Sequence, residues 1–306
     1  MPNKQTRRWF LKETMLLGVT VAMDTLETMA GIQEAKAKLP KIKLGKLDVS
    51  RLILGSNPFF GFAHGNPQAS GEDMKQYYTK ERIMAVMDKA AEHGITAVWT
   101  PCYEHWIRLW NEYQENGGKL KIWIAQPDRL PMKKEIAAAV KNGSKAICIQ
   151  GCRVDDEVKK GNFNVLRDWV EYIKSFGLPA GIATHRPNTH LMTEEKGLPT
   201  DFYHQCLYQP EDYSKKCRDM AITTIKQLEK PVVGYKVLAA GRIPPKVAFS
   251  HVFKYLRRKD GICVGVFPKD DPHQILKNAS LTRKLTQYSV NVFEIEKETP
   301  DHAKNH

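Results

Sequence analysis

From residue 41 onward, short apolar runs alternate with segments in which apolar residues recur every three or four positions. The runs predict buried strands, and the segments predict amphipathic helices. A chain that alternates strand and helix in this way forms a parallel sheet whose strands are joined by crossover helices, so we predict an α/β fold. The predicted strands lie at residues 41–44, 49–54, 97–100, 121–125, 146–149, 180–183, 202–207, 232–238 and 262–267.

The helices between these strands have recognisable ends. Thr79 can cap the first of them, because a hydroxyl accepts from free backbone amides, and Gly94 can end it, because glycine adopts the left-handed conformation. Pro131 can begin another helix. The predicted helices are 80–93, one that holds Trp106 and Trp110, one from 131 to 143, 165–176, 218–229, 246–258 and a last one from 272 to 284.

The stretch that opens the fold carries a family resemblance. A turn at Gly45-Lys46 separates two apolar runs, which predicts a β-hairpin, and the second run continues to Gly55 as a buried strand. The run Val49-Ser50-Arg51-Leu52-Ile53-Leu54-Gly55 resembles the Val-Ser-x-Leu-x-Leu-Gly segment of the aldo/keto reductase superfamily. The resemblance implies a (β/α)8 TIM barrel over residues 38–298, with an N-terminal β-hairpin that plugs its base and a polar tail at 299–306.

The resemblance also indicates which catalytic residues to expect. Aldo/keto reductases carry an Asp, Tyr, Lys and His tetrad, in which the Lys lowers the pKa of the Tyr that donates a proton to the carbonyl. Tyr103 matches the Tyr, whereas Trp99, Gln126 and Gln150 stand at the other three positions. Because a glutamine side chain does not ionise, we expect an altered mechanism in which other groups assist Tyr103.

Further polar residues follow the predicted strands, and the carboxyl ends of barrel strands form the active face. Glu104 and His185 could assist Tyr103 in proton transfer. Lys236 stands in an apolar run, where burial would lower its pKa and could make it a base or a Schiff-base former. The structural alternative for Lys236 is an ion pair with a nearby carboxylate.

The resemblance further implies a nicotinamide cofactor, NADP or NAD, at the ends of the later strands. In the family, polar side chains hold the nicotinamide amide, a tyrosine stacks on its ring, and a basic residue with two amides or acids grips the phosphate and adenine. The positions that match these cofactor-binding residues are Thr184, His185, Gln205, Tyr235, Lys269, Gln274 and Asn278.

Two other kinds of function remain open. A metal could be held by His185 and His204 with Cys102 as a third ligand, which would favour a lyase, isomerase or hydrolase acting on a sugar-like substrate, as would a cofactor-free site. Strand alternation places His204 and Gln205 on opposite faces, so an inward Gln205 would turn His204 outward. The altered tetrad also fits a non-catalytic barrel that binds a ligand. The aromatic loop 57–78 suits either a hydrophobic lid or stacking on a sugar.

The N-terminus predicts export. Thr6-Arg7-Arg8-Trp9-Phe10-Leu11-Lys12 matches the twin-arginine signal pattern, an apolar stretch follows at 15–23, and Ala35-Lys36-Ala37 offers a cleavage site. We therefore expect residues 1–37 to be a signal peptide read by the twin-arginine export machinery, with the mature protein in the periplasm. This route carries folded proteins, so a tightly held cofactor could travel with the chain. The apolar stretch is too short to span a membrane stably.

Composition narrows the partners and the cysteine chemistry. The formal charge is +13, but no nucleic-acid motif accompanies it, and we interpret it as a solvated basic surface on a protein that acts on a small molecule. Six cysteines are present without a Cys-x-x-Cys pair, which disfavours a structural zinc site. Cys148 and Cys263 fall in apolar runs and are expected to be buried thiols.

Overall fold

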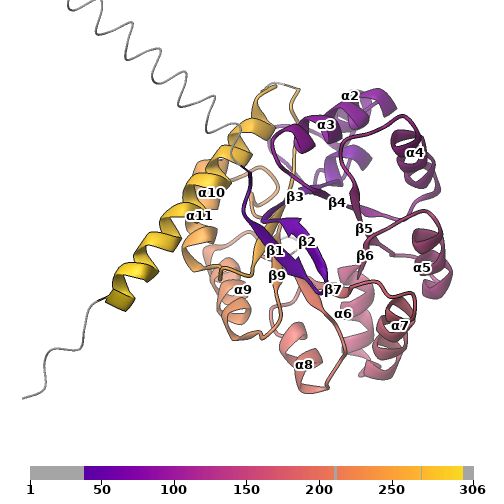
Figure 1. Ribbon diagram of the computed structural model, residues 1–306. Coiled ribbons are helices and arrows are strands. Elements are labelled where there is room, and N and C mark those ends of the chain that lie inside the picture. Colours follow the sequence, from indigo (N-terminus) through magenta and orange to yellow (C-terminus); the bar gives the residue numbers. More distant parts are fainter. Residues whose placement is uncertain (1–37, 210–211, 270, 299–306) are drawn as a thin grey trace, which may run out of the picture. The chain divides into compact units, whose positions relative to one another are not determined.

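The barrel predicted from the sequence is present. In the computed structural model, which describes residues 38–209, 212–269 and 271–298, eight parallel strands close in the order β10-β3-β4-β5-β6-β7-β8-β9. Figure 1 shows helices surrounding these strands. The strands are β3 (Leu52–Gly55), β4 (Ala97–Pro101), β5 (Ile122–Gln126), β6 (Ala146–Ile149), β7 (Ala180–Thr184), β8 (Phe202–Cys206), β9 (Val232–Tyr235) and β10 (Gly261–Gly265).

The helices that cover the barrel alternate with the strands, as the apolar spacing predicts. Their buried faces are apolar and meet the outward side chains of the strands, which forms one layer of the core. The helices predicted from the sequence appear as α3 (Lys80–Glu92), α4 (Glu104–Glu115), α5 (Met132–Lys141), α7 (Phe163–Ser175), α9 (Lys215–Gln227), α10 (Pro245–Tyr255) and α11 (Gln274–Glu298).

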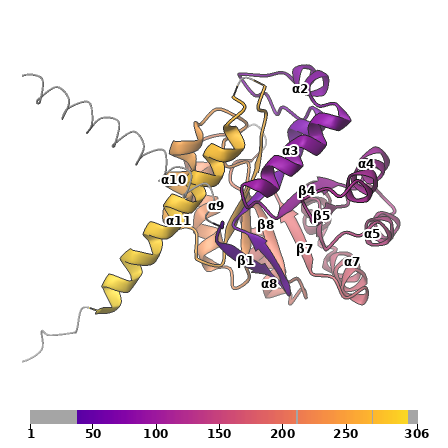
Figure 2. The ribbon, with the colours of Figure 1, turned by 45° about the horizontal axis from the view of Figure 1, so that its top comes forward.

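A hairpin closes the N-terminal end of the barrel (Figure 2). Its strands, β1 (Lys41–Leu44) and β2 (Leu47–Ser50), pair antiparallel. Ile42, Leu44 and Val49 join the apolar cluster inside the barrel, so the hairpin acts as a plug. The prediction of one strand over 49–54 is wrong, because the chain changes partners at Arg51. The amide of Arg51 donates to Pro40 at 2.8 Å, and its carbonyl accepts from Ile262 of β10 at 2.7 Å.

Side chains along each strand point alternately into the barrel interior and toward the helical layer. On β8, Phe202 and Cys206 belong to the interior cluster, whereas Tyr203 and Leu207 belong to the helical layer. His204 points inward, with its ring centre 4.2 Å from that of Trp99, and Gln205 points outward. The opposite placement of these two residues is confirmed, but an inward orientation of Gln205 is wrong.

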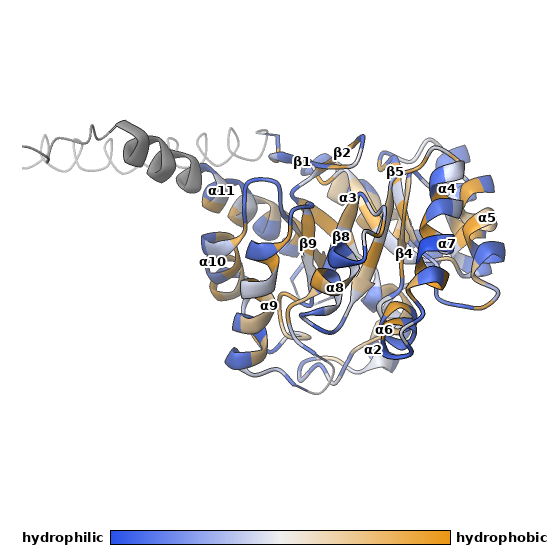
Figure 3. Cartoon of the chain, turned by 90° about the horizontal axis from the view of Figure 1, so that it is seen from below, coloured by the Kyte–Doolittle hydropathy of each residue, from blue (hydrophilic) through white to orange (hydrophobic). Residues whose placement is uncertain are grey.

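Several short elements were not predicted, and they lie at the ends of strands. They are the 3-10 helix η1 (Asn57–Phe60) and the helices α2 (Gly71–Tyr77), α6 (Gly151–Lys159) and α8 (Thr189–Glu195). In Figure 3, α2 and α6 lie at the end of the barrel opposite the hairpin, where the strands finish. The strand predicted at 232–238 is too long, because Lys236 has a φ of 56° and ends β9 at Tyr235.

The predicted signal peptide, residues 1–37, and the polar tail, residues 299–306, lie outside the described residues. Within the part of the chain that the structure describes, no helix combines the length and the apolar character needed to cross a membrane.

Candidate active site

A cavity of about 290 Å³ opens at the carboxyl end of the barrel, the end that carries the active site in TIM-barrel enzymes. Loops after β3, β9 and β10 form its walls, and Trp99, Gln126 and Tyr235 reach it from the strands. An indole, an amide and a phenol, each from a different strand, thus converge at one opening. We use the name "mouth" for this cavity together with the strand ends and loops that form or adjoin it.

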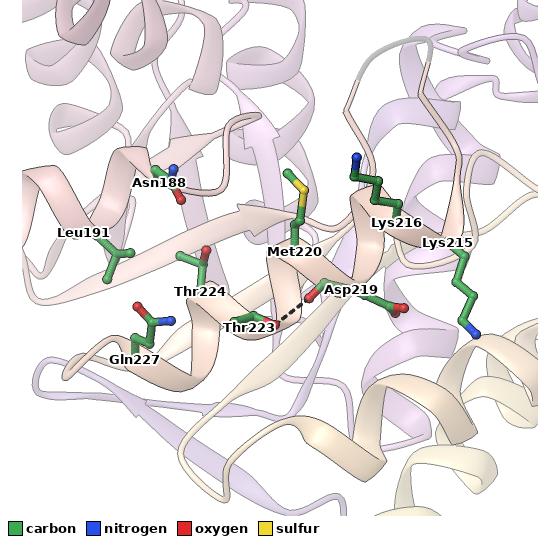
Figure 4. A pocket seen from close by; sticks show the side chains of 9 residues that line it. All are labelled: Asn188, Leu191, Lys215, Lys216, Asp219, Met220, Thr223, Thr224 and Gln227. Carbon is green, nitrogen blue, oxygen red and sulfur yellow. Dashed lines mark hydrogen bonds between the residues drawn. The ribbon is translucent and has the colours of Figure 1, made fainter.

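A larger hollow, about 710 Å³, lies on the outside of the protein between α8 and α9 (Figure 4). Surface side chains such as Lys216, Asp219 and Met220 line it, and the hydroxyl of Thr223 bonds the carbonyl of Asp219 within its own helix at 2.9 Å. None of its lining comes from the ends of the barrel strands. We therefore place the candidate site at the smaller cavity.

Tyr235 and the loop after it shape one wall of the mouth. The Tyr235 hydroxyl donates to the carbonyl of Thr184 at 2.9 Å, which fixes the ring inside the barrel end. Lys236, Ala239 and Ala240 all have positive φ, between 49° and 56°. Each such residue costs about 1 kcal/mol of backbone strain, and strain of this kind gathers at functional loops. Lys236 is half-buried and lines the cavity. The strained backbone conformation therefore belongs to a residue that brings an amine to the mouth.

His64, in the loop after β3, supplies an imidazole to the same cavity. Its Nε2 lies 3.1 Å from the Nδ2 of Asn57, and both residues line the cavity. The packing around the ring and then the charges of Lys236 and His185 lower the pKa of His64, although part of the residue is open to solvent. His64 is therefore neutral at pH 7 and can accept a proton.

His185 is held beside the mouth by a buried carboxylate. Asp155 of α6 accepts from the backbone amide of His185 and contacts its Nδ1, both at 3.0 Å, and it also accepts from the hydroxyl of Thr184. Burial lowers the pKa of His185, but its hydrogen bonds to Asp155 and Cys152 outweigh this effect and raise the pKa to about 9. His185 thus carries a proton at neutral pH, on a side chain that is 16% exposed.

Asp155 and Cys152 were not predicted as site residues, because the helix that carries them was not predicted. Gln150 begins α6 by accepting from the amides of Cys152 and Arg153, at 2.8 and 3.2 Å. The sequence signal was therefore a side-chain oxygen before the helix and a helical spacing of Val154 and Val158. Residue 150, which matches the family's His position, here caps a helix.

Tyr103 and Glu104 are less well placed for proton transfer in the cavity than the resemblance implies. The Tyr103 hydroxyl donates to Asp128 Oδ2 at 2.8 Å, and neither residue is among those that line the cavity. Burial and then the Asp128 carboxylate raise the pKa of Tyr103, the reverse of the shift that the family's Lys produces. The side chain of Glu104 is 83% exposed and pairs with Arg108 at 2.6 Å.

We expect Tyr103→Phe to retain most of any catalytic activity, because the hydroxyl is engaged by Asp128 outside the cavity. The variant should lose about 1 kcal/mol of unfolding free energy through the lost hydrogen bond. Steady-state kinetics and urea unfolding measure the two effects. A loss of activity of a hundredfold or more, with stability unchanged, would return Tyr103 to the role of proton donor.

Only some of the residues that match the family's cofactor positions line the cavity. Tyr235 and Gln274 line the cavity, and Gln274 is fixed by accepting from the amide of Phe267 at 2.6 Å. One turn further along α11, Asn278 is buried, and neither of its amide atoms has a hydrogen-bond partner among the described residues. The others do not line the cavity: Lys269 is exposed, the side chains of Thr184 and His185 engage Asp155, and that of Gln205 engages the Cys206 carbonyl.

The three ligands of the alternative metal site are not brought together. His204 lies in the barrel interior against Trp99, His185 bonds Asp155, and the buried Cys102 follows β4. Among the described residues, no group of three His, Cys, Asp or Glu side chains could hold a metal ion.

Comparison with known proteins supports the architecture. No protein-family model matches the chain, and no curated protein matches it. A solved structure from Pseudomonas aeruginosa, provisionally named an aldo-keto reductase, superposes with a TM-score of 0.59 at 14% identity, over 82% of this chain and 98% of that one. The barrel is similar to those of aldo-keto reductases.

Other solved structures limit what this similarity means. A second Pseudomonas aeruginosa structure with the same provisional name has a TM-score of 0.57 at 14% identity, over 82% of this chain and 96% of that one. An N-acetylneuraminic acid synthetase from Leptospira borgpetersenii reaches 0.50 at 12% identity, over 88% of this chain and all of that one. Because TIM barrels host unrelated activities, the fold supports no specific function by itself.

Proposed function

We propose that the protein is a diverged oxidoreductase of the aldo/keto reductase type that binds NADP or NAD at the mouth and acts on a small carbonyl compound or carbohydrate. The observation that carries the proposal is the cavity next to Tyr235, the residue that matches the family's nicotinamide-stacking tyrosine. Trp99 and Gln126 face the same space. An apolar opening with a few convergent polar groups is the usual form of a cofactor site.

The size of the cavity restricts how the cofactor would bind. At about 290 Å³ it suits the nicotinamide end and a small substrate, since pockets for larger ligands span about 300 to 1,000 Å³. Lys236 would meet the negative pyrophosphate at the rim. Gln274, with the unpartnered amide of Asn278 one turn away, would meet the adenosine end. Thr184 and Gln205 would not hold the nicotinamide in this orientation.

His185 replaces Tyr103 as the proton donor in this proposal. An imidazolium whose pKa is about 9 holds its proton at neutral pH and can release it to an oxygen that gains negative charge. The ring centre of His185 lies 5.9 Å from that of Tyr235, so the donor stands beside the cavity. The cofactor supplies the hydride when it is bound, and the protein supplies the proton and the orientation.

The expected cellular setting fits a tightly held cofactor. We propose that the chain is exported by the twin-arginine route after it has folded around its nucleotide. A freely exchanging nicotinamide cofactor would not be resupplied in the periplasm.

Nucleotide binding can be followed through tryptophan emission, which should transfer energy to bound NADPH or NADH because one of the tryptophans, Trp99, lines the cavity. We expect saturable binding to the wild-type protein, and about tenfold weaker binding to Lys236→Met, since one charge contact is worth about 1.4 kcal/mol. Lys216→Met, on the outer hollow, is the matched control and should bind like wild type.

The titration has two outcomes that contradict the proposal. Equal weakening by Lys236→Met and Lys216→Met would show non-specific attraction of an anion to a basic surface. No energy transfer at millimolar nucleotide would leave a cofactor-free lyase, isomerase or hydrolase, or a non-catalytic barrel that binds a ligand.

A further inference from the structure

We propose that Cys152 is a nucleophile of the mouth that adds to the carbonyl carbon of a small aldehyde, with His185 as proton donor and Asp155 as the residue that positions His185. The substrate class rests on the proposed function, in which a small carbonyl compound is bound. The covalent chemistry rests on the cluster of these three side chains and requires no nucleotide.

The geometry of the cluster has the parts that nucleophilic catalysis by a thiol needs. Cys152 Sγ lies 3.9 Å from His185 Nδ1, and Asp155 Oδ2 lies 3.0 Å from the same nitrogen. A carboxylate only accepts, so Nδ1 carries a proton and Nε2 carries the second proton of the imidazolium. Thiol and hydroxyl enzymes use the same three groups, but there the nucleophile and the carboxylate bond opposite ring nitrogens, whereas here both face Nδ1 and leave Nε2 to donate its proton to the substrate.

The local backbone favours the ionised thiol. Cys152 is the second residue of α6, where free amides and the helix dipole stabilise negative charge. The hydrogen bond to His185 is the largest cause that lowers the pKa of Cys152, and Gln150 adds to it. The facing titratable groups are His185, which favours the thiolate, and Asp155, which opposes it.

Gly151 shows that the cluster and the cavity are built as one site. A Cβ at Gly151 would lie 2.8 Å from Cε1 and 2.9 Å from Nδ1 of His185, and 3.2 Å from the hydroxyl oxygen of Tyr235. The absence of a side chain therefore lets the imidazole and the phenol approach the start of α6 together. Cys152 is the next residue in the chain and does not itself line the cavity, so the cluster is joined to the cavity through Gly151, His185 and Tyr235.

Cys152 also differs from the other cysteines, all of which lie in the described part of the chain. It is exposed, whereas the other five are buried, and burial raises the pKa of each of those five thiols. A reactive thiol combines access with a low pKa, and here Cys152 has both. The buried cysteines are Cys102, Cys148, Cys206, Cys217 and Cys263.

The proposed step balances without an oxidant. The sulfur lone pair of the Cys152 thiolate forms a carbon–sulfur bond, and the π pair of the carbonyl moves to oxygen. That oxygen takes the Nε2 proton of His185, which becomes a neutral imidazole still bonded to Asp155 through Nδ1. The product is a thiohemiacetal, and the reverse step releases the aldehyde.

The first test measures thiol reactivity in the full chain without nucleotide. Iodoacetamide at pH 7, followed by intact mass, should label one cysteine at least tenfold faster than free cysteine labels, because more of Cys152 is thiolate. Cys152→Ser should lose the fast phase, His185→Gln should slow it at least fivefold, and Cys217→Ser should label like wild type. A wild-type rate equal to that of free cysteine, or an unchanged rate in His185→Gln, would overturn the proposal.

The second test detects the adduct and needs no variant that alters the core. With [1-13C]propanal as the probe, the wild-type protein should give a thiohemiacetal carbon signal that Cys152→Ser lacks, while adducts to lysines remain in both. A spectrum identical for the two proteins would overturn the proposal. Because Cys152→Ser should still bind NADPH in the tryptophan titration, failure of the thiol chemistry and failure of the nucleotide site are distinguishable.

Discussion

Replacing Asp155 with Ala should cost about 3 kcal/mol of unfolding free energy, the largest effect we expect from a single substitution at the site. Asp155 is buried, and four groups contact it: the amide and ring of His185 and the hydroxyls of Thr184 and Thr189. Truncation to Ala removes the acceptor of the His185 imidazolium and leaves the Thr184 hydroxyl only the Arg186 carbonyl, at 3.2 Å. Urea unfolding at pH 7 measures the loss.

Two neighbouring substitutions serve as controls for Asp155→Ala. Asp156→Ala changes an exposed carboxylate on the same helix and should alter stability by less than about 0.5 kcal/mol. Asp155→Asn keeps the shape but removes the charge, so the pKa of His185, followed by NMR, should fall from about 9. A His185 pKa that does not move in Asp155→Asn would contradict the role we give to this carboxylate.

Acidification from pH 7 to pH 5 should remove about 3 kcal/mol of unfolding free energy, a large part of the stability of an ordinary domain. His190 and His204 are fully buried, and burial lowers the pKa of His190 to about 4 and that of His204 to about 3. In the unfolded chain both titrate near 6.5. Their contribution is therefore present above pH 6.5 and is lost as the pH falls toward the folded-state values.

The magnitude follows from linkage at the two fully buried imidazoles; the exposed His64, whose pKa is also lowered, acts in the same direction with a smaller effect. At pH 5 each of the two imidazoles lowers the free energy of unfolding by about 2 kcal/mol, because it is protonated in the unfolded chain and neutral in the folded chain. His185, whose pKa is raised, has the opposite sign: its contribution is complete below pH 6.5 and is lost as the pH rises through about 9. When the pH falls from 7 to 5, His185 therefore adds about 1 kcal/mol to the free energy of unfolding.

Urea unfolding at the two pH values tests this dependence. His204→Phe should remove about half of the acid loss, because an aromatic ring fits against Trp99 and Phe202 and cannot be protonated. His273→Gln, an exposed control, should retain the full loss. A wild-type loss below about 1 kcal/mol would mean that water or another group reaches the buried imidazoles.

The sequence predicts the barrel well because each strand is a continuous apolar run. Predicted and observed strands differ by at most two residues at six of the eight barrel strands, and the exceptions have local causes. At Arg51 the chain passes from the hairpin to the barrel, and at Lys236 a left-handed residue ends the strand. The pattern of apolar residues shows neither the change of the strand's hydrogen-bonding partner at Arg51 nor the positive φ of Lys236.

The orientation of side chains at the site was harder to predict. Strands of a parallel barrel are buried on both faces, so alternation shows that His204 and Gln205 differ but not which of them points inward. The resemblance suggested the wrong choice. The structure instead puts a neutral imidazole inside the barrel and an amide among the helices.

Contacts between separate loops could not be predicted at all. His185 was predicted as a candidate, but its partner Asp155 lies 30 residues earlier, on the amphipathic helix α6, which was not predicted. The hydrogen bond from Tyr103 to Asp128 likewise joins the ends of two strands. Both pairs raise the pKa of a candidate proton donor, and this is why we propose His185 rather than Tyr103 as the donor.

Native mass spectrometry of the protein purified from its own cells tests most directly whether the mouth holds a nicotinamide dinucleotide. We predict a mass above that of the protein by one NADP or NAD, which is released on unfolding and is much reduced in Lys236→Met. The mass of the protein alone, both as purified and after incubation with excess nucleotide, would contradict the account.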